Sequence, residues 1–183
     1  RLVGLTPTES AELVATVAGT SPPPIADALH QRTRGNPFFL CETARLLAAE
    51  GVPREELTAA AVRALVPDTV REVVERRVLR LPDDTQRMLR LTAMGGSGAE
   101  LSVLQHATGL GADEVIAVLE PAVRAGLLVE QEDEIGWRFG HALAQDAVRA
   151  TISRTTRARM HATLATAIEH VHANDLDDHL DEL

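Results

Sequence analysis

The stretch LLVEQEDEIGWRF, residues 127–139, decides the fold class of a chain that otherwise has helical periodicity. Two short runs with a strand-like pattern, Leu127–Glu130 and Gly136–Phe139, flank an acidic turn from Gln131 to Glu134. Two such runs separated by a few polar residues predict a β-hairpin. The hairpin distinguishes this chain from a plain helical bundle.

The segments on either side of the hairpin predict helices. Before it, helical patterns begin at Asp83, Leu101 and Ala112, and glycine-rich turns separate them. After it, helical signal runs from Ala142 to His172, with a break near Ser153. Three helices followed by a hairpin are typical of a winged-helix domain, and the remaining signal predicts a C-terminal helix.

The first third of the chain predicts a small helical bundle. Thr6 and Glu9 have the spacing of a capping box around Pro7, and Asn36 followed by Pro37 repeats the pattern of a cap and a proline in the first turn. The expected fold is therefore mainly α. It comprises a helical bundle over residues 1–65, a winged-helix domain with one hairpin over 66–160, and a terminal helix with an acidic tail over 161–183.

Composition excludes several functional classes. Hydrophobic residues make up 45% of the chain and aromatic residues only 2%, which favours packed helices over an all-β fold. All 18 basic residues are arginines, so a Walker A loop, which needs a lysine, cannot be complete. No apolar run is long enough to span a membrane, and the single cysteine, Cys41, fits a reducing compartment, so we expect a cytoplasmic protein.

The residues that usually carry catalysis or bind metals do not cluster. The seven histidines are scattered and form no HExxH or Cys/His motif, and no nucleophile elbow of the GxSxG type is present. The sequence therefore predicts no catalytic residues and no metal site.

The net charge of −9 argues against direct contact with nucleic acid. Asp113, Glu114 and Glu120 outnumber the single Arg124 in the helix that would enter a DNA groove, and the hairpin turn is acidic as well. Two alternatives remain open at this point. One is a free-standing winged-helix DNA-binding protein, and the other is an adaptor that binds proteins through the hairpin and the terminal helix.

Three segments together resemble one protein family. Residues 33–40, TRGNPFFL, with Glu42 and the leucine pair after it, resemble the GNPFF element of STAND signalling ATPases, which are related to AAA+ proteins. Residues 66–82 look like the next block of that family, and residues 137–143, WRFGHAL, with the RMH run at 159–161, resemble its FxHxL block and following helix. Large ATP-binding LuxR-type and SARP-type transcriptional regulators of bacteria belong to this class.

The resemblance implies a nucleotide-sensing regulatory segment without the P-loop core. Residues 1–65 would be the helical lid of the ATPase, and the parent protein would bind ATP or ADP. Gly35, Asn36 and Pro37 match a Gly-x-Pro motif that packs near the adenine, and His141 matches a winged-helix histidine that contacts the β-phosphate of ADP. Two positions depart from the family pattern. Relatives have an aspartate where this chain has Ala142, and many have a glycine where it has Arg34.

The resemblance also implies the partners. The chain begins at Arg1, so we expect a segment of a longer protein in which an upstream P-loop core and an effector domain contact it. Self-association is left open. We expect no ATPase activity from the segment alone, and no contact with membrane.

Overall fold

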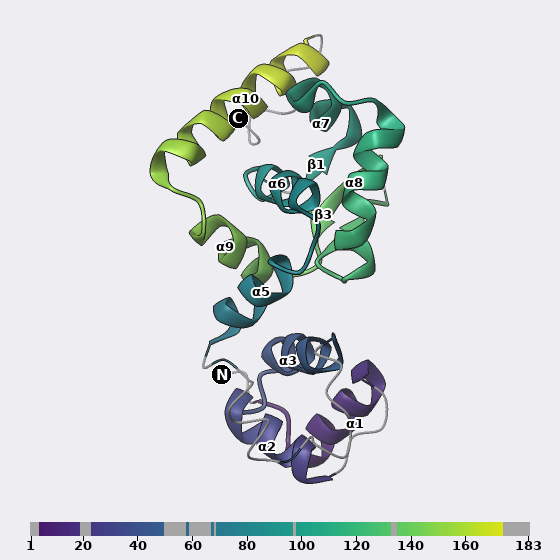
Figure 1. The fold of residues 1–183 in the computed structure, drawn as a ribbon, viewed down its shortest axis with the longest axis vertical. Coiled ribbons are helices and arrows are strands. Elements are labelled where there is room, and N and C mark those ends of the chain that lie inside the picture. Colours follow the sequence, from purple (N-terminus) through teal and green to yellow (C-terminus); the bar gives the residue numbers. More distant parts are fainter. Residues whose placement is uncertain are drawn as a thin grey trace. The chain divides into compact units, whose positions relative to one another are not determined.

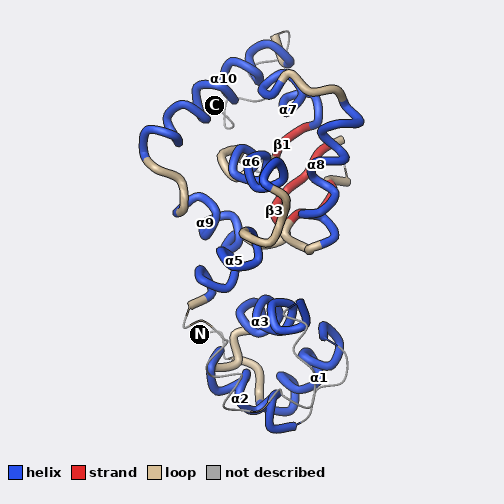
Figure 2. The backbone as a smooth tube through the Cα atoms, viewed as in Figure 1, coloured by secondary structure: helices blue, strands red, loops and turns tan. Residues whose placement is uncertain are grey.

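The computed structural model describes residues 4–18, 23–49, 58, 67, 69–96, 98–132 and 135–173. In these residues the protein is mainly helical and has one small antiparallel sheet (Figures 1 and 2). The chain divides into two compact units, Arg1–Arg77 and Val78–Leu183, which are described separately below. The expectation of a mainly α protein with a hairpin is confirmed at this level, while the predicted boundary between residues 65 and 66 lies outside the described residues.

The first unit is built from helices. They are α1 (Pro7–Ala18), α2 (Pro23–Thr33), α3 (Pro37–Ala49) and α5 (Val70–Val78), the last of which extends one residue beyond the division. Helices α1, α2 and α3 pack against one another. Their shared core consists of Val14, Ile25, Ala28, Leu29, Leu40, Ala44 and Leu47.

Helix α1 begins as its sequence predicts. The Thr6 backbone N–H donates to the Glu9 carboxylate at 2.8 Å, and the Glu9 N–H donates back to the Thr6 hydroxyl at 3.3 Å. These reciprocal bonds satisfy two helix-start donors. The bonds from the Thr6 N–H and hydroxyl also lower the pKa of Glu9, because they stabilise its charged form.

The second unit surrounds a three-stranded sheet with helices. Its elements are α6 (Asp83–Thr92), β1 (Ala99–Glu100), α7 (Leu101–Thr108), α8 (Ala112–Arg124), β2 (Leu128–Glu130), β3 (Gly136–Phe139), α9 (Ala142–Ala150) and α10 (Arg154–Val171). Helix α6 contacts both α8 and α9, and α10 packs on α7 (Figure 1). Leu89, Leu104, Leu119 and Leu128 are fully buried on elements that pack against one another.

The sheet contains the expected hairpin and one strand that the sequence did not predict. Strands β2 and β3 are antiparallel, with Leu128 opposite Phe139 and Glu130 opposite Trp137. The extra strand β1 pairs with the other edge of β3 and gives the order β1-β3-β2 (Figure 2). It is only two residues long, and Ala99 reaches its partner Trp137 from far along the chain. No local pattern identifies so short a strand.

Polar contacts fix the C-terminal helices of this unit. Arg149 and Gln145 of α9 both donate to the carbonyls of Ala93 and Gly95, just after the end of α6. These donors satisfy carbonyls that the end of a helix leaves without partners, and the arginine charge suits the negative end of the helix dipole. Between α7 and α10, the rings of His106 and His170 stack with centroids 4.1 Å apart.

Helix α10 is one continuous element. It begins after Ser153, whose hydroxyl accepts a hydrogen bond from the Thr156 N–H at 3.2 Å, so the predicted helix break is confirmed. The helix runs through the predicted domain boundary at residues 160 and 161 without interruption. The acidic tail from residue 174 onward lies outside the described residues. Among those that are described, no helix is both long and apolar enough to cross a membrane.

Candidate functional site

The α2–α3 turn carries the first three predicted site residues and has left-handed backbone at two consecutive positions. Arg34 has a φ of +53° and Gly35 a φ of +69°. The Gly35 N–H donates to the His30 carbonyl at 3.3 Å, and the Asn36 N–H donates to the Thr33 carbonyl at 3.0 Å. This is a Schellman-type end of α2, in which Arg34 occupies the left-handed position that glycine usually takes.

Gly35 is also covered by the segment before α1. Its carbonyl accepts a hydrogen bond from the Leu5 N–H at 2.8 Å, and the residue is buried. A Cβ at this position would lie 2.3 Å from the Leu5 carbonyl oxygen and 2.8 Å from the Leu5 nitrogen. The close approach of two backbones therefore excludes any side chain here.

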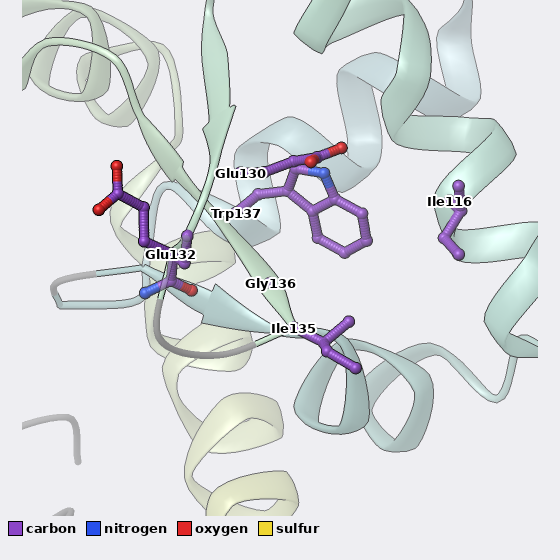
Figure 3. Close-up of a pocket in the computed structure, with 7 residues that line it drawn as sticks. Ile116, Glu130, Glu132, Ile135, Gly136 and Trp137 are labelled. Atoms are coloured by element: carbon purple, nitrogen blue, oxygen red, sulfur yellow. The ribbon is translucent and has the colours of Figure 1, made fainter.

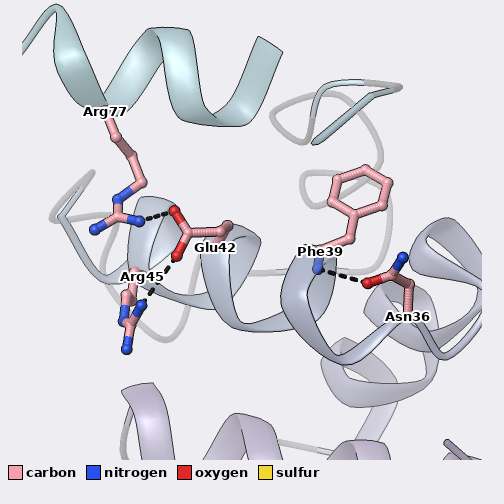
Figure 4. Close-up of polar contacts among 5 residues, drawn as sticks. All are labelled: Asn36, Phe39, Glu42, Arg45 and Arg77. Carbon is pink, nitrogen blue, oxygen red and sulfur yellow. Dashed lines mark hydrogen bonds and ion pairs between the residues drawn. The ribbon is translucent and has the colours of Figure 1, made fainter. Parts of the chain in front are cut away.

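Asn36 and Pro37 start α3. The Asn36 side-chain oxygen accepts a hydrogen bond from the Phe39 N–H at 3.0 Å, so Asn36 is the N-cap that the sequence predicts (Figure 4). Pro37 occupies the first helical position, where a missing N–H costs nothing. Both residues are exposed. Local structure thus accounts for the Gly-Asn-Pro sequence, and of its three residues only Asn36 and Pro37 present a surface to a ligand.

One turn further along α3, a buried carboxylate joins two elements of the first unit. Glu42 of α3 is 1% exposed and pairs with Arg77 of α5, which is 7% exposed (Figure 4). Arg45, which is partly exposed, donates to the other carboxylate oxygen at 2.9 Å. Burial lowers the pKa of Arg77 to about 10, so the guanidinium is still charged at neutral pH. The two arginines offset the cost of burying the carboxylate.

His141 begins α9 in the second unit. It follows β3 by two residues, and its Nδ1 accepts a hydrogen bond from the Leu143 N–H at 3.1 Å. An accepting Nδ1 assigns the proton of the neutral ring to Nε2. The sequence prediction of a histidine that lies after a strand and opens a helix is therefore confirmed as local structure.

The predicted site residues belong to different units. Gly35, Asn36 and Pro37 lie in the first unit and His141 in the second, so each half of the predicted nucleotide site is described by itself. The structure therefore brings the first three together and leaves the pairing with His141 a prediction. Within the described ranges, no three histidine, cysteine or acidic side chains gather closely enough to hold a metal ion.

The second unit contains a hollow that the sequence prediction did not include. We name it the α8–hairpin cleft. It has a volume of about 380 Å³, and it is lined by Ile116, Glu130, Gln131, Glu132, Ile135, Gly136 and Trp137. Ile116 comes from α8 and the other residues from the hairpin (Figure 3). The Trp137 ring and Ile116 lie on two sides of the cleft, Ile135 lies at its edge, and Glu130 is beside the indole (Figure 3).

A larger hollow of about 770 Å³ lies among α6, α7, α8 and α10. Its apolar surface includes Met88, Leu91 and Met160. The charges on its lining are balanced, because Asp84 and Glu114 accompany Arg87 and Arg159. Asp84 also pairs with Arg87. This balance selects no particular ligand charge, so the hollow does not indicate one ligand class.

The sequence did contain signals for two features that were missed. Glu42 lies three residues after Phe39 and four before Leu46, on the apolar face of its helix, and a carboxylate on such a face needs a buried partner. Ile116 lies between Asp113 and Glu120 on the acidic face of α8. An isoleucine among exposed acids indicates a surface contact rather than core packing.

Comparison with known proteins adds no assignment: no protein-family model matches the chain, and no curated protein matches it.

Proposed function

We propose that the chain is the regulatory lid and winged-helix segment of a STAND-type signalling ATPase, as in large ATP-binding LuxR-type or SARP-type transcriptional regulators. The bound nucleotide of the parent protein would set how these parts pack on the upstream P-loop core. That packing would control whether an effector domain is released. Such a protein works in the cytoplasm.

The order of elements in the second unit carries this proposal. The sequence α6–β1–α7–α8–β2–β3, with sheet order β1-β3-β2, matches the arrangement of a winged helix, in which the third helix precedes the hairpin. This match includes β1, which the sequence did not predict. In the first unit, the Gly-Asn-Pro turn between two packed helices is compatible with a lid.

A regulatory role suits the chemistry better than a catalytic one. The chain has no lysine for a Walker A loop, so the segment alone should not hydrolyse ATP. The exposed Asn36 and Pro37 offer a surface for an adenine, and His141 stands at a helix start, where anions are favoured. Most phosphate contacts would come from the upstream core.

Direct DNA binding is the weaker alternative. The exposed side chains of α8 include Asp113, Glu114 and Glu120, and only Arg124 opposes them. Glu130 and Glu132 add negative charge beside the hairpin turn. A surface of this sign repels phosphates. An electrophoretic shift assay on duplex DNA tests the point, and tight binding that weakens with salt would favour the DNA-binding alternative.

The nucleotide role is tested in the full-length parent by measuring ADP affinity calorimetrically. Pro37→Ala and His141→Ala are compared with His161→Ala, a matched control on the exposed surface of α10. Losing a hydrogen bond to a charged phosphate should weaken ADP binding by about tenfold or more in His141→Ala. The control should bind as the wild type does. Unchanged affinity in both site variants would remove these residues from the nucleotide site.

A further inference from the structure

The α8–hairpin cleft exposes apolar side chains from two elements. Among the described residues, four large hydrophobic side chains are exposed, and two of them line this one cleft: Ile135 is 76% exposed and Ile116 is 45% exposed. Single exposed apolar residues are common on protein surfaces, but two that face one hollow form a contact surface. The buried Trp137 ring lies across the cleft from Ile116 (Figure 3).

The charge around this apolar surface has one sign. Glu130 and Glu132 line the cleft, and no arginine or histidine appears among its described lining residues. On α8, Asp113 and Glu120 are exposed and stand three residues before and four residues after Ile116, on the same helix face. The isoleucines therefore lie within a group of carboxylates.

The cations nearest in sequence do not neutralise this group. Arg124 lies 3.8 Å from Glu120, one turn further along α8, and both side chains are well exposed, so their attraction is weak. Arg138 alternates with the buried Trp137 along β3 and so projects from the opposite face of the strand. The described lining of the cleft therefore carries a net negative charge.

We propose that the α8–hairpin cleft docks a basic protein segment through an aliphatic side chain. The aliphatic anchor would enter the cleft and contact Ile116, Ile135 and the Trp137 ring, and lysines or arginines beside it would meet Glu130 and Glu132. Charge complementarity selects this partner, because it attracts a cationic peptide and repels nucleic acid and acidic surfaces. The docking surface lies within the second unit and does not depend on the nucleotide role proposed above.

The experiment measures the fluorescence anisotropy of synthetic helical peptides of roughly 15 residues. The first carries lysines on one face and leucines on the other, the second has glutamates in place of the lysines, and the third has glutamines in place of the leucines. The first peptide should bind the whole chain, with an affinity that falls as salt is added. Equal binding of all three would overturn the proposal.

Variants locate the binding. Ile135→Ser should weaken binding of the leucine–lysine peptide by about tenfold, because it removes exposed apolar contact area and leaves the core intact. Glu130→Gln combined with Glu132→Gln should weaken it by roughly fivefold at low salt. The matched control, Asp146→Asn with Glu169→Gln, removes the same charge from exposed helix positions elsewhere in this unit and should leave binding within about twofold.

Three results contradict the inference. An equal loss of peptide affinity in the cleft double variant and in the control double variant means that net charge alone attracts the peptide. Duplex DNA that competes for the intact cleft means a nucleic-acid surface instead. Sedimentation that reveals dimers, lost in Ile135→Ser, means that a second copy of the chain occupies the cleft. Thermal melts of all variants, followed by Trp137 fluorescence, check that each one is folded.

Discussion

Gly35 is the residue at which left-handed backbone and a crossing chain segment coincide. Gly35→Ala places a Cβ against the Leu5 backbone and adds strain at a φ of +69°. We expect it to lower the unfolding free energy of the first unit by at least about 2 kcal/mol. Urea unfolding followed by far-UV circular dichroism measures the change, with the intact chain as reference.

Arg34→Gly is the matched control for this prediction. Arg34 has the same left-handed backbone but an exposed side chain, so glycine relieves strain there. The unfolding free energy should rise by about 0.5–1 kcal/mol. A loss of stability in both variants would mean that left-handed backbone strain does not determine the effect of either substitution.

At the scale of elements, α5 is joined to α3 by a buried ion pair. Glu42→Gln removes the buried negative charge that Arg77 and Arg45 share, which should cost about 3–5 kcal/mol. Arg45 donates to the same carboxylate from a partly exposed position, so Arg45→Ala should lower the unfolding free energy by less than about 1 kcal/mol. The double variant Glu42→Leu with Arg77→Met should recover most of the stability that Glu42→Gln loses. Urea unfolding of the three variants measures these differences.

The pH dependence of this pair follows from Arg77. Burial lowers its pKa to about 10, below that of an exposed arginine. Below that value the folded and unfolded chains both hold the proton, so the cost of burying the cation is fully present and constant with pH. As pH rises through that value the folded state releases its proton first, and the cost declines. The cost of burying the Arg77 cation should therefore be the same at mildly acidic and at neutral pH.

Elements differ in how much of them the sequence predicts. The starts at Thr6, Asn36 and Ser153 depend on bonds to residues three positions away, so local patterns are sufficient. The hairpin is also local. In contrast, β1 exists because Ala99 pairs with Trp137, and Glu42 meets Arg77 from 35 positions away. Tertiary packing brings such partners together, and no spacing rule predicts it.

At the scale of the whole molecule, the two compact units predict two separable unfolding transitions. The only tryptophan, Trp137, is in the second unit and reports that unit alone. Arg149→Ala removes donors from the carbonyls of Ala93 and Gly95 and should lower the stability reported by Trp137 fluorescence by about 1.5–3 kcal/mol.

The comparison with two further variants checks this separation. Gly35→Ala should leave the Trp137 transition unchanged, since the substitution lies in the other unit. Arg154→Ala, an exposed arginine at the start of α10, should also leave it nearly unchanged. One shared transition that both Gly35→Ala and Arg149→Ala displace equally would show that the chain unfolds as a single cooperative unit.

The candidate site could be predicted only in part, because its residues belong to two separate units. Local signals place Asn36, Pro37 and His141 at helix starts, and the structure has them there. Whether they share a ligand depends on the arrangement of two units, which no local pattern encodes. The α8–hairpin cleft was missed because Ile116 and Ile135 line one hollow only when α8 packs beside the hairpin.

The hydrogen bond from Leu5 to Gly35 gives the first residues of the chain an influence beyond their own segment. The polypeptide before α1 packs over the turn that precedes α3 and holds it through this hydrogen bond. Proteolytic trimming that removed Leu5 would leave the buried Gly35 carbonyl open to water and release the Gly-Asn-Pro turn from one side. An expression boundary for this domain therefore belongs upstream of Gly4, even though the first helix begins only at Pro7.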